Sequence, residues 1–341
     1  MLYEALRPLL FQLDAETSHD LMLGTMAKIS GHPALLKRLQ RTYGDRVASK
    51  PRRVMGIDFP NPVGLAAGLD KAGAAAPAFA ALGFGFIELG TVTPKAQPGN
   101  EKTRLFRLTG NRAIINRMGF NSDGLKVFVR NLESRKPGCI TGINLGKNAV
   151  TPIESALDDY QAGLRASWKL ADYITINISS PNTKNLRQLQ EGDELNTLLA
   201  GIDQERLRLQ DQYQVNVPIA LKVAPDLDSD GIKHIAQLCN QHRMDGLMAA
   251  NTTLARPENL EPRFRSENGG LSGEPLTAAS TAVIASFRQE LGEGFPIIGV
   301  GGIMNASDAR DKLEAGSDLL QVYTGLIYRG PALVREIVDG L

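Results

Sequence analysis

The residues best suited to chemistry lie where one apolar segment runs into a short polar turn. The segment Tyr173–Ile178 alternates as a β-strand does, and Asn177 falls near its end. Ser180 and Asn182 follow in a turn that Pro181 stiffens. They offer a hydroxyl that could move a proton and carboxamides that donate and accept hydrogen bonds. Ser, Pro and Asn also form ordinary turns, so this motif does not identify a site by itself.

Polar side chains recur at the same relative place along the chain, at or just after short apolar segments. Buried strand ends are unfavourable for lysine and asparagine unless partners are present. If the strands are parallel, their ends meet at one face, and a shared polar ligand explains the pattern better than chance does. These residues are Asp70, Lys71, Thr91, Asn144, Lys147, Asn177, Ser180, Lys222, Asn251, Thr252 and Thr253.

Two glycine-rich turns follow the last apolar segments. They are Gly299-Val300-Gly301-Gly302 and Tyr323-Thr324-Gly325. In barrel enzymes the loops after strands seven and eight commonly bind phosphate through bare backbone N–H groups. These turns therefore predict a phosphorylated cofactor or substrate.

A further element, Asn116–Asn121, has the character of a binding loop more than of a helix. Asn116, like Asn177, Asn182 and Asn251, carries a planar carboxamide with a donor and an acceptor. Such groups suit a ring built from amide and imide functions, so we expect a pyrimidine-like ligand.

The elements that must position these residues alternate between short apolar runs and longer helical patterns. This alternation is typical of repeated βα units, and eight units fit a closed (β/α)8 TIM barrel of the α/β class. A doubly wound open sheet is the competing fold, but Gly64–Gly68 does not supply its phosphate-binding glycine motif. The eight candidate strands are Val63–Ala67, Phe86–Gly90, Ile140–Leu145, Tyr173–Ile178, Ile219–Val223, Gly246–Ala250, Ile297–Val300 and Leu319–Tyr323.

The first 45 residues form an N-terminal extension to the barrel domain of residues 46–341. Apolar residues at Leu9–Leu13 and Leu21–Ile29 predict two short amphipathic helices separated by Asp14–Thr17. A basic run from Lys37 to Arg53 follows. Two interpretations stay open: a helical pair that caps one barrel end, and a membrane-surface anchor beside cationic residues.

Composition excludes several classes of function. A formal net charge of +1 gives no electrostatic case for nucleic-acid binding. Cys139 and Cys239 lack the number and spacing of a disulfide framework, and no His, Cys or carboxylate cluster has the spacing of metal ligands. We see no secretory signal and no apolar window near the roughly 20 residues of a spanning helix, so we expect a soluble or peripheral protein.

With these residues assembled, the chain resembles the class 2, quinone-dependent dihydroorotate dehydrogenases over its whole length. Seven motifs match that family's pattern in order, and such a series is highly specific. They are Ala66–Lys71, Gly90–Pro94, Pro98–Asn100, Asn116–Asn121, Asn177–Asn182, Gly269–Gly273 and Gly299–Ile303.

The resemblance implies that FMN lies across the barrel mouth and that dihydroorotate binds beside it. Lys71 would hold the substrate carboxylate, while a loop formed by Arg117, Met118, Gly119 and Phe120 closes over the ring. The ring itself would meet Asn116, Asn177, Asn182, Asn251 and Thr252. The implied FMN contacts are Ala66, Ala67, Gly68, Leu69, Asp70, Thr91, Asn144, Asn177, Lys222, Ala250, Gly273, Gly302, Tyr323 and Thr324.

The same resemblance assigns the catalytic roles. Ser180 would take the proton from C5 of dihydroorotate while C6 passes a hydride to flavin N5, and Lys222 would stabilise the reduced flavin. A serine base needs a proton outlet through water or a neighbouring hydroxyl. Serine here, where class 1 relatives carry cysteine, marks class 2.

The N-terminal extension is the second mark of class 2, since it resembles the lid through which a ubiquinone or menaquinone tail enters. His19 and Arg107 match positions along that path. The resemblance implies a monomeric enzyme of pyrimidine (UMP) synthesis. We place it peripherally on the cytoplasmic face of a bacterial inner membrane, the bacterial host being inferred from the absence of a targeting segment.

The sequence departs from the family pattern at Ala250 and at Lys184-Asn185, which bears on a flavin contact and on loop motion. Three rival functions fit these residues less well. A flavin-dependent transfer-RNA uridine reductase should carry a basic face and a cysteine acid. A phosphosugar isomerase or aldolase could use Lys222 but gives no reason for the asparagines. A non-catalytic scaffold would leave the polar strand ends without partners.

Overall fold

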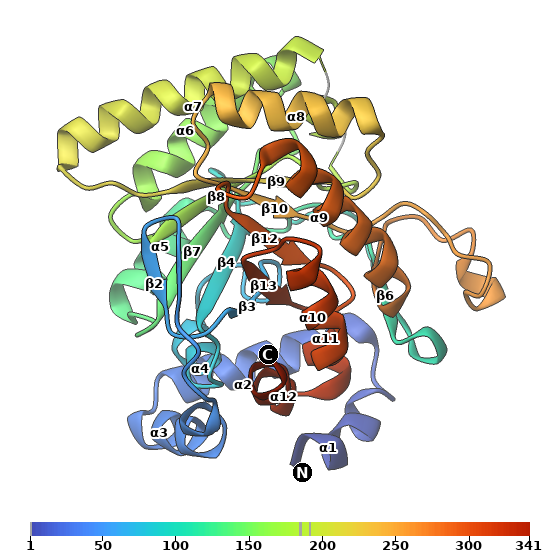
Figure 1. Ribbon diagram of the computed structural model, residues 1–341. Coiled ribbons are helices and arrows are strands. Elements are labelled where there is room, and N and C mark those ends of the chain that lie inside the picture. Colours follow the sequence, from blue (N-terminus) through green and yellow to red (C-terminus); the bar gives the residue numbers. More distant parts are fainter. Residues whose placement is uncertain (1, 184–185, 191) are drawn as a thin grey trace.

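The computed structural model describes residues 2–183, 186–190 and 192–341 (Figure 1). Eight parallel strands close into a barrel in the order β10-β12-β13-β3-β4-β7-β8-β9. The (β/α)8 barrel predicted from the sequence is confirmed. Its strands are β3 (Val63–Leu65), β4 (Phe86–Val92), β7 (Ile140–Leu145), β8 (Tyr173–Asn177), β9 (Ile219–Val223), β10 (Gly246–Ala249), β12 (Ile297–Val300) and β13 (Leu319–Val322).

The barrel strands are apolar because both of their faces are covered. Every residue of β4, β8 and β9 is buried, and their outer side chains pack against the surrounding helices. Those helices are α4 (Ala76–Ala80), α5 (Leu125–Ser134), α6 (Ala156–Ser167), α7 (Gly192–Tyr213), α8 (Ser229–Gln241), α9 (Thr277–Leu291), α10 (Ala306–Glu314), α11 (Thr324–Arg329) and α12 (Ala332–Gly340). Short 3-10 helices lie at Gly44–Arg46, Thr109–Asn111, Ile153–Ser155, Leu186–Gln190, Pro262–Phe264 and Glu274–Leu276.

Two small antiparallel sheets complete the fold, and the sequence analysis did not predict them. A hairpin of β1 (Arg52–Val54) and β2 (Ile57–Phe59) closes the N-terminal end of the barrel. The Phe59 ring there packs edge-on against Phe86, with centroids 5.1 Å apart. The second sheet has the order β11-β6-β5, with β5 (Leu105–Leu108), β6 (Ala113–Asn116) and β11 (Gly270–Gly273).

The N-terminal extension contains three helices rather than the two that we predicted: α1 (Leu2–Leu10), α2 (Ala15–Ser30) and α3 (Pro33–Thr42). The expected Asp14–Thr17 break is also too long. The Asp14 carboxylate accepts the N–H groups of Glu16 and Thr17, both at 3.0 Å, and so caps α2 directly. We interpreted the segment of α3 only as a basic run, although its Leu36 and Leu39 pack against the core at helical spacing.

In the extension, α1 lies beside α11, and α2 and α3 pack against α4 (Figure 1). Glu16 of α2 forms a buried ion pair with Arg104, at 2.8 Å, and Met26 of the same helix joins the main core. Tyr3 donates a hydrogen bond to the Ile327 carbonyl. Among the described helices, none combines the length and apolar character needed to cross a bilayer.

Candidate active site

A cavity opens at the carboxyl ends of the barrel strands, where barrel enzymes place their sites. Its walls come from the ends of β3, β4, β8, β9, β10, β12 and β13, from the small sheet of β5, β6 and β11, and from α2. Strand ends far apart in the sequence therefore converge as expected. The candidate residues that line the cavity are His19, Ala66, Ala67, Gly68, Lys71, Thr91, Asn116, Met118, Gly119, Phe120, Asn177, Ser180, Asn182, Lys222, Ala250, Asn251, Thr252, Gly273, Gly302, Tyr323 and Thr324.

Seven candidates lie outside the cavity lining: Leu69, Asp70, Arg107, Arg117, Asn144, Lys147 and Thr253. Asp70 is fully buried, and its carboxylate accepts the backbone N–H groups of Ala74 at 3.1 Å and Ala75 at 2.8 Å. Burial raises the pKa of Asp70, although these hydrogen bonds act in the opposite direction. Asp70 thus shapes the turn after β3 instead of facing a ligand, and neighbouring Leu69 is buried in the core.

The two candidate arginines have protein partners of their own. Arg117 pairs with Glu267, and its guanidinium lies 4.7 Å from the centroid of the Phe106 ring. Arg107 lies over the Phe11 ring at 4.3 Å and donates to the Phe11 carbonyl at 3.1 Å. Arg107 therefore fastens the connection between α1 and α2 to the small sheet.

Ser180 is 5 % exposed and accepts one hydrogen bond, from the Asn182 N–H at 3.2 Å. Its own hydroxyl proton has no acceptor in the described protein. The Asn182 carboxamide donates to Asn116 Oδ1 at 3.2 Å, which joins this loop to β6. In the same loop, the buried Thr183 hydroxyl has no partner among the described residues. The departure at Lys184-Asn185 lies outside the described residues.

Hydrogen bonds fix the carboxamides at the strand ends. Asn177 Nδ2 donates to Thr91 Oγ1 and to Asn144 Oδ1, both at 3.1 Å. Asn177 Oδ1 accepts from Ser179 Oγ at 2.8 Å, and Ser179 Oγ in turn accepts from Asn251 Nδ2 at 2.8 Å. Asn144 does not line the cavity, but it orients Asn177, which does. The network holds the polar groups at the ends of β8 and β10 in a single fixed arrangement.

Glu88, which the sequence analysis did not select, is the centre of this network inside the barrel. It is fully buried and accepts hydrogen bonds from Asn144 Nδ2 (2.7 Å), Tyr173 Oη (2.9 Å), Thr175 Oγ1 (3.1 Å) and Gln321 Nε2 (2.9 Å). Gln321 also lines the cavity. The available sequence signal was a lone carboxylate within an apolar strand, which needs partners to be stable.

Two lysines, the half-buried Lys71 and the buried Lys222, make the cavity cationic. Lys71 donates to Asn121 Oδ1, and burial, assisted by the charge of Arg104, lowers its pKa to about 8. Burial also lowers the pKa of Lys222, against the opposing effect of Glu88. Lys222 has no hydrogen-bond or ion-pair partner in the described part of the chain. A buried ammonium that faces a cavity without a partner suits a negatively charged ligand.

His19 brings α2 into the same wall. Burial lowers the pKa of His19, and the nearby charge of Lys71 lowers it further. Leu105 and Ile114 of the small sheet also line the cavity. The extension therefore supplies part of the site and is more than a cover for the outside of the barrel.

The glycine turn after β12 brings bare backbone to the cavity. Gly301 and Gly302 both line it and have φ values of 111° and 73°. A Cβ on Gly302 would lie 2.3 Å from Thr277 Oγ1, so a larger residue does not fit this turn. Exposed backbone of this kind suits a phosphate group.

The mouth of this closed parallel barrel holds a serine hydroxyl, fixed carboxamides and an unpaired cationic nitrogen. These groups define a barrel enzyme for an anionic ligand that carries amide groups. Residues 51–341 match the family model described as dihydroorotate dehydrogenase. The chain belongs to this family, whose members are flavin-dependent.

Similar proteins place the chain in the quinone-dependent class. Dihydroorotate dehydrogenase (quinone) of Chromobacterium violaceum is 55% identical over 336 residues, which cover 98% of this chain and 96% of the relative. The protein of the same name from Herminiimonas arsenicoxydans is 53% identical over 348 residues, covering 100% and 97%. A crystal structure of DHODH from Eimeria tenella in complex with ferulenol superposes with a TM-score of 0.87 at 37% identity, covering 96% of this chain and 90% of that one.

Proposed function

We propose that this protein oxidises dihydroorotate to orotate in pyrimidine synthesis, with bound FMN as the first electron acceptor and a membrane quinone as the last. The observation that carries the proposal is one cavity that holds both the Ser180 hydroxyl and the unpartnered Lys222 ammonium. The first can remove a proton, and the second can compensate negative charge on a cofactor.

Ser180 acts as the base that removes the proton from C5 of dihydroorotate. Its hydroxyl proton is not committed to another protein group, so it can turn towards an outlet. The buried and unpartnered Thr183 hydroxyl, three residues along the same loop, is a suitable next carrier. A serine base depends on such a relay because its own hydroxyl is only weakly acidic.

Lys71 and the fixed carboxamides orient the substrate. Lys71 supplies the cation for the carboxylate of dihydroorotate, while Asn116 and Asn182, already hydrogen-bonded to each other, face its ring amides. Asn177, Asn251 and Thr252 complete the set on the strand side, and the Met118–Phe120 loop excludes water from above.

The residues at the barrel mouth fit FMN. When bound, FMN accepts the hydride from C6 of the substrate and passes the electrons on. Lys222 supplies positive charge on β9, and the Gly301-Gly302 turn after β12 and Thr324 after β13 supply a phosphate cradle. Ala66–Gly68 after β3 also line the cavity, and a Cβ on Gly68 would come within 3.3 Å of the Tyr323 ring.

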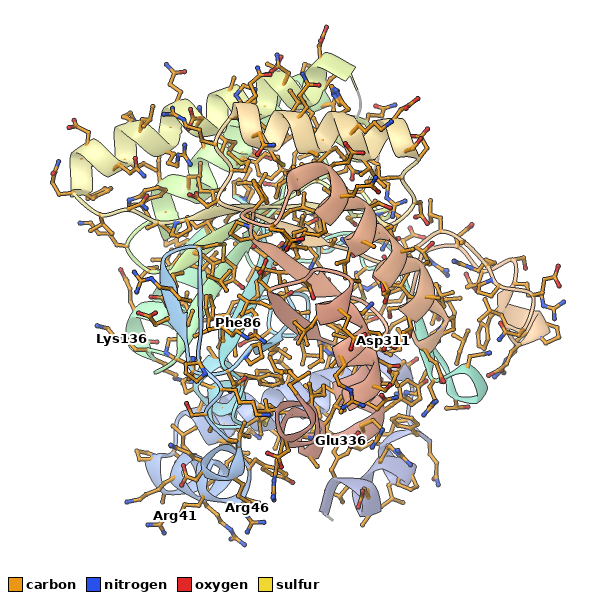
Figure 2. The ribbon with its side chains drawn as sticks, viewed as in Figure 1. Arg41, Arg46, Phe86, Lys136, Asp311 and Glu336 are labelled. Carbon is orange, nitrogen blue, oxygen red and sulfur yellow. The ribbon has the colours of Figure 1, made fainter. Side chains whose placement is uncertain are left out.

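The N-terminal extension supports peripheral attachment to the cytoplasmic face of a bacterial inner membrane by a monomer. Leu9 is 61% exposed and Leu21 is 55% exposed, which leaves apolar side chains of α1 and α2 free to enter the lipid interface. Figure 2 shows Arg41 of α3 and Arg46 of the Gly44–Arg46 turn projecting away from the body of the protein. His19 and Arg107 lie where this extension meets the barrel, on the side from which a ubiquinone or menaquinone tail would enter.

The cofactor and the acceptor can be tested on the purified protein. Mass spectrometry of the small molecule released by denaturation should give FMN at about one equivalent per chain. The holoenzyme should then reduce a long-tailed quinone when dihydroorotate is supplied. Release of FAD, or release of no flavin from a protein that also fails to take up FMN, would contradict the proposed cofactor.

A further inference from the structure

Lys312, on α10, is a completely buried lysine that lies outside the cavity lining. Its ammonium donates to Ser280 Oγ at 2.6 Å, to Thr281 Oγ1 at 2.9 Å and to the Thr277 carbonyl at 3.4 Å. All three acceptors belong to the first turns of α9 and all are neutral. Within the described ranges no carboxylate lies at ion-pair distance from this ammonium, although the charges of Asp308 and Asp311 on the same helix oppose the effect of burial on its pKa. Burial lowers the pKa of Lys312 to about 8.

The partners of Lys312 also hold the glycine turn after β12. Ser280 Oγ lies 3.0 Å from the Gly301 carbonyl oxygen, and Thr277 Oγ1 lies 2.8 Å from that of Gly302. One hydroxyl therefore separates the buried ammonium from the backbone of a turn that lines the cavity.

The packing leaves this turn little freedom to adjust. A Cβ on Gly301 would lie 3.1 Å from Ser280 Oγ, and a Cβ on Gly302 would lie 2.5 Å from the Thr277 backbone nitrogen. The start of α9 thus presses directly on the turn, and Lys312 fastens the start of α9 to α10. A change at Lys312 should be transmitted to the position of the turn.

A buried ammonium without a carboxylate partner is unfavourable unless another negative charge compensates it. The protein groups at hydrogen-bonding distance supply only dipoles. A phosphate in the adjacent glycine cradle would add negative charge to that of the more distant Asp308 and Asp311, and its two charges would gain from a cation held in a medium of low dielectric constant.

We propose that Lys312 is a positioning residue for the phosphate of the flavin cofactor. It holds the Gly301-Gly302 turn through Ser280 and supplies the positive charge that favours a phosphorylated flavin over riboflavin. This inference rests on the FMN site proposed above, and it assigns a role to a side chain that touches neither flavin ring nor substrate.

The test compares the affinities of FMN and riboflavin, which differ in the phosphate. Full-length protein freed of flavin is titrated with each compound, and binding is followed by quenching of flavin fluorescence. Lys312→Met keeps an unbranched apolar side chain but removes the charge. We expect the ratio of riboflavin Kd to FMN Kd to fall by about tenfold or more, because one charge interaction is lost at an effective dielectric constant well below that of water. The riboflavin Kd should change by less than about threefold.

Three further variants separate this role from general stability. Lys147 is also buried, but its ammonium donates to the Asn148 carbonyl at 2.9 Å and the Thr151 carbonyl at 2.5 Å, so Lys147→Met should leave the ratio unchanged. Ser280→Ala removes the bridge from Lys312 to Gly301 and should lower the ratio. Thr281→Val removes another hydrogen bond of Lys312 but does not affect a contact with the turn, so it should leave the ratio unchanged.

The outcomes are distinct. A wild-type ratio near one would overturn the FMN site itself. A wild-type preference for FMN that survives Lys312→Met unchanged would overturn the role of Lys312 alone, as would equal weakening of both flavins. If Lys312→Met does not fold, the comparison of Ser280→Ala with Thr281→Val decides: a lower ratio in the first alone supports the proposal, and equal ratios refute it.

Discussion

Replacing Ser180 with alanine should separate the chemistry of the cavity from the architecture that holds it. The side chain is almost fully buried, and its one hydrogen bond within the described protein is accepted from the Asn182 N–H at 3.2 Å. Losing a neutral hydrogen bond costs about 1 kcal/mol of stability. The variant should therefore fold, keep its flavin and bind orotate with an affinity within about threefold of wild type.

The effect on the reaction should be far larger than the effect on stability. A positioned general base contributes roughly 10² to 10⁴ in rate. Ser180→Ala should then slow flavin reduction by at least about a hundredfold, which corresponds to about 2.7 kcal/mol in the activation barrier. A loss of this size combined with intact orotate binding would place Ser180 in the chemical step and not in ground-state binding.

Anaerobic stopped-flow mixing with dihydroorotate measures this step directly through the loss of flavin absorbance. Ser180→Cys is the matched control because a thiol keeps an ionisable group at the same position, so its rate should lie between those of wild type and Ser180→Ala. Thr183→Val should also slow reduction if its buried hydroxyl carries the proton onward. A near-normal rate in Ser180→Ala would refute Ser180 as the base.

Three further predictions concern charge and membrane contact. Since burial lowers the pKa of Lys71 to about 8, kcat/KM for dihydroorotate should fall above that pH, and Lys71→Met should lack this limb of the profile. Glu16→Gln leaves Arg104 buried without its ion-pair partner and should cost on the order of 3 kcal/mol in denaturant unfolding; an unchanged midpoint would contradict the pairing. Leu9→Asp combined with Leu21→Asp should reduce co-flotation with lipid vesicles at least about tenfold while flavin reduction stays normal, and undiminished flotation would count against the proposed anchor.

The Glu16 pair also gives stability a defined dependence on pH. Burial raises the pKa of Glu16, but the hydrogen bonds and charges of Arg104 and Lys102 outweigh this and hold it below the ordinary value of 4.5. A depressed folded-state pKa means that the contribution is complete above pH 4.5 and is lost as the pH falls through the lowered value. The stability difference between wild type and Glu16→Gln should therefore shrink on acidification below this point.

The barrel was predictable because its strands carry a strong local signal. Strands β7, β9 and β12 begin and end at the predicted residues, since parallel strands buried on both faces read as continuous apolar runs between polar ones. The other five barrel strands differ only at their C-terminal ends, where the chain turns into the cavity loops.

The small sheets were not predictable in the same way. The β5–β6 pair and β11 are short, and β11 pairs with β6 across more than 150 residues of sequence, so no local periodicity marks the contact. Helix α3 has no buried residue, but it does carry an apolar stripe, in which Leu36 and Leu39 pack against the core; we missed the helix because we interpreted this segment only as a basic run.

A residue's position at a strand end predicted well whether it lines the cavity. Its position next to another residue of the same motif predicted this less well. Lys71 reaches the cavity, whereas its neighbour Asp70 turns inward to cap backbone groups. Glu88 and Lys312 were missed because their partners come from elements distant in sequence, and a single charged residue in an apolar stretch does not show what will neutralise it.

The absorption spectrum of the purified protein, recorded anaerobically before and after addition of dihydroorotate, tests the central claim most directly. We expect an oxidised flavin spectrum that bleaches on addition, which would establish the cofactor and the first half-reaction together. A flavin spectrum that stays oxidised would contradict the proposed substrate, and a colourless protein that does not take up FMN would contradict the account as a whole.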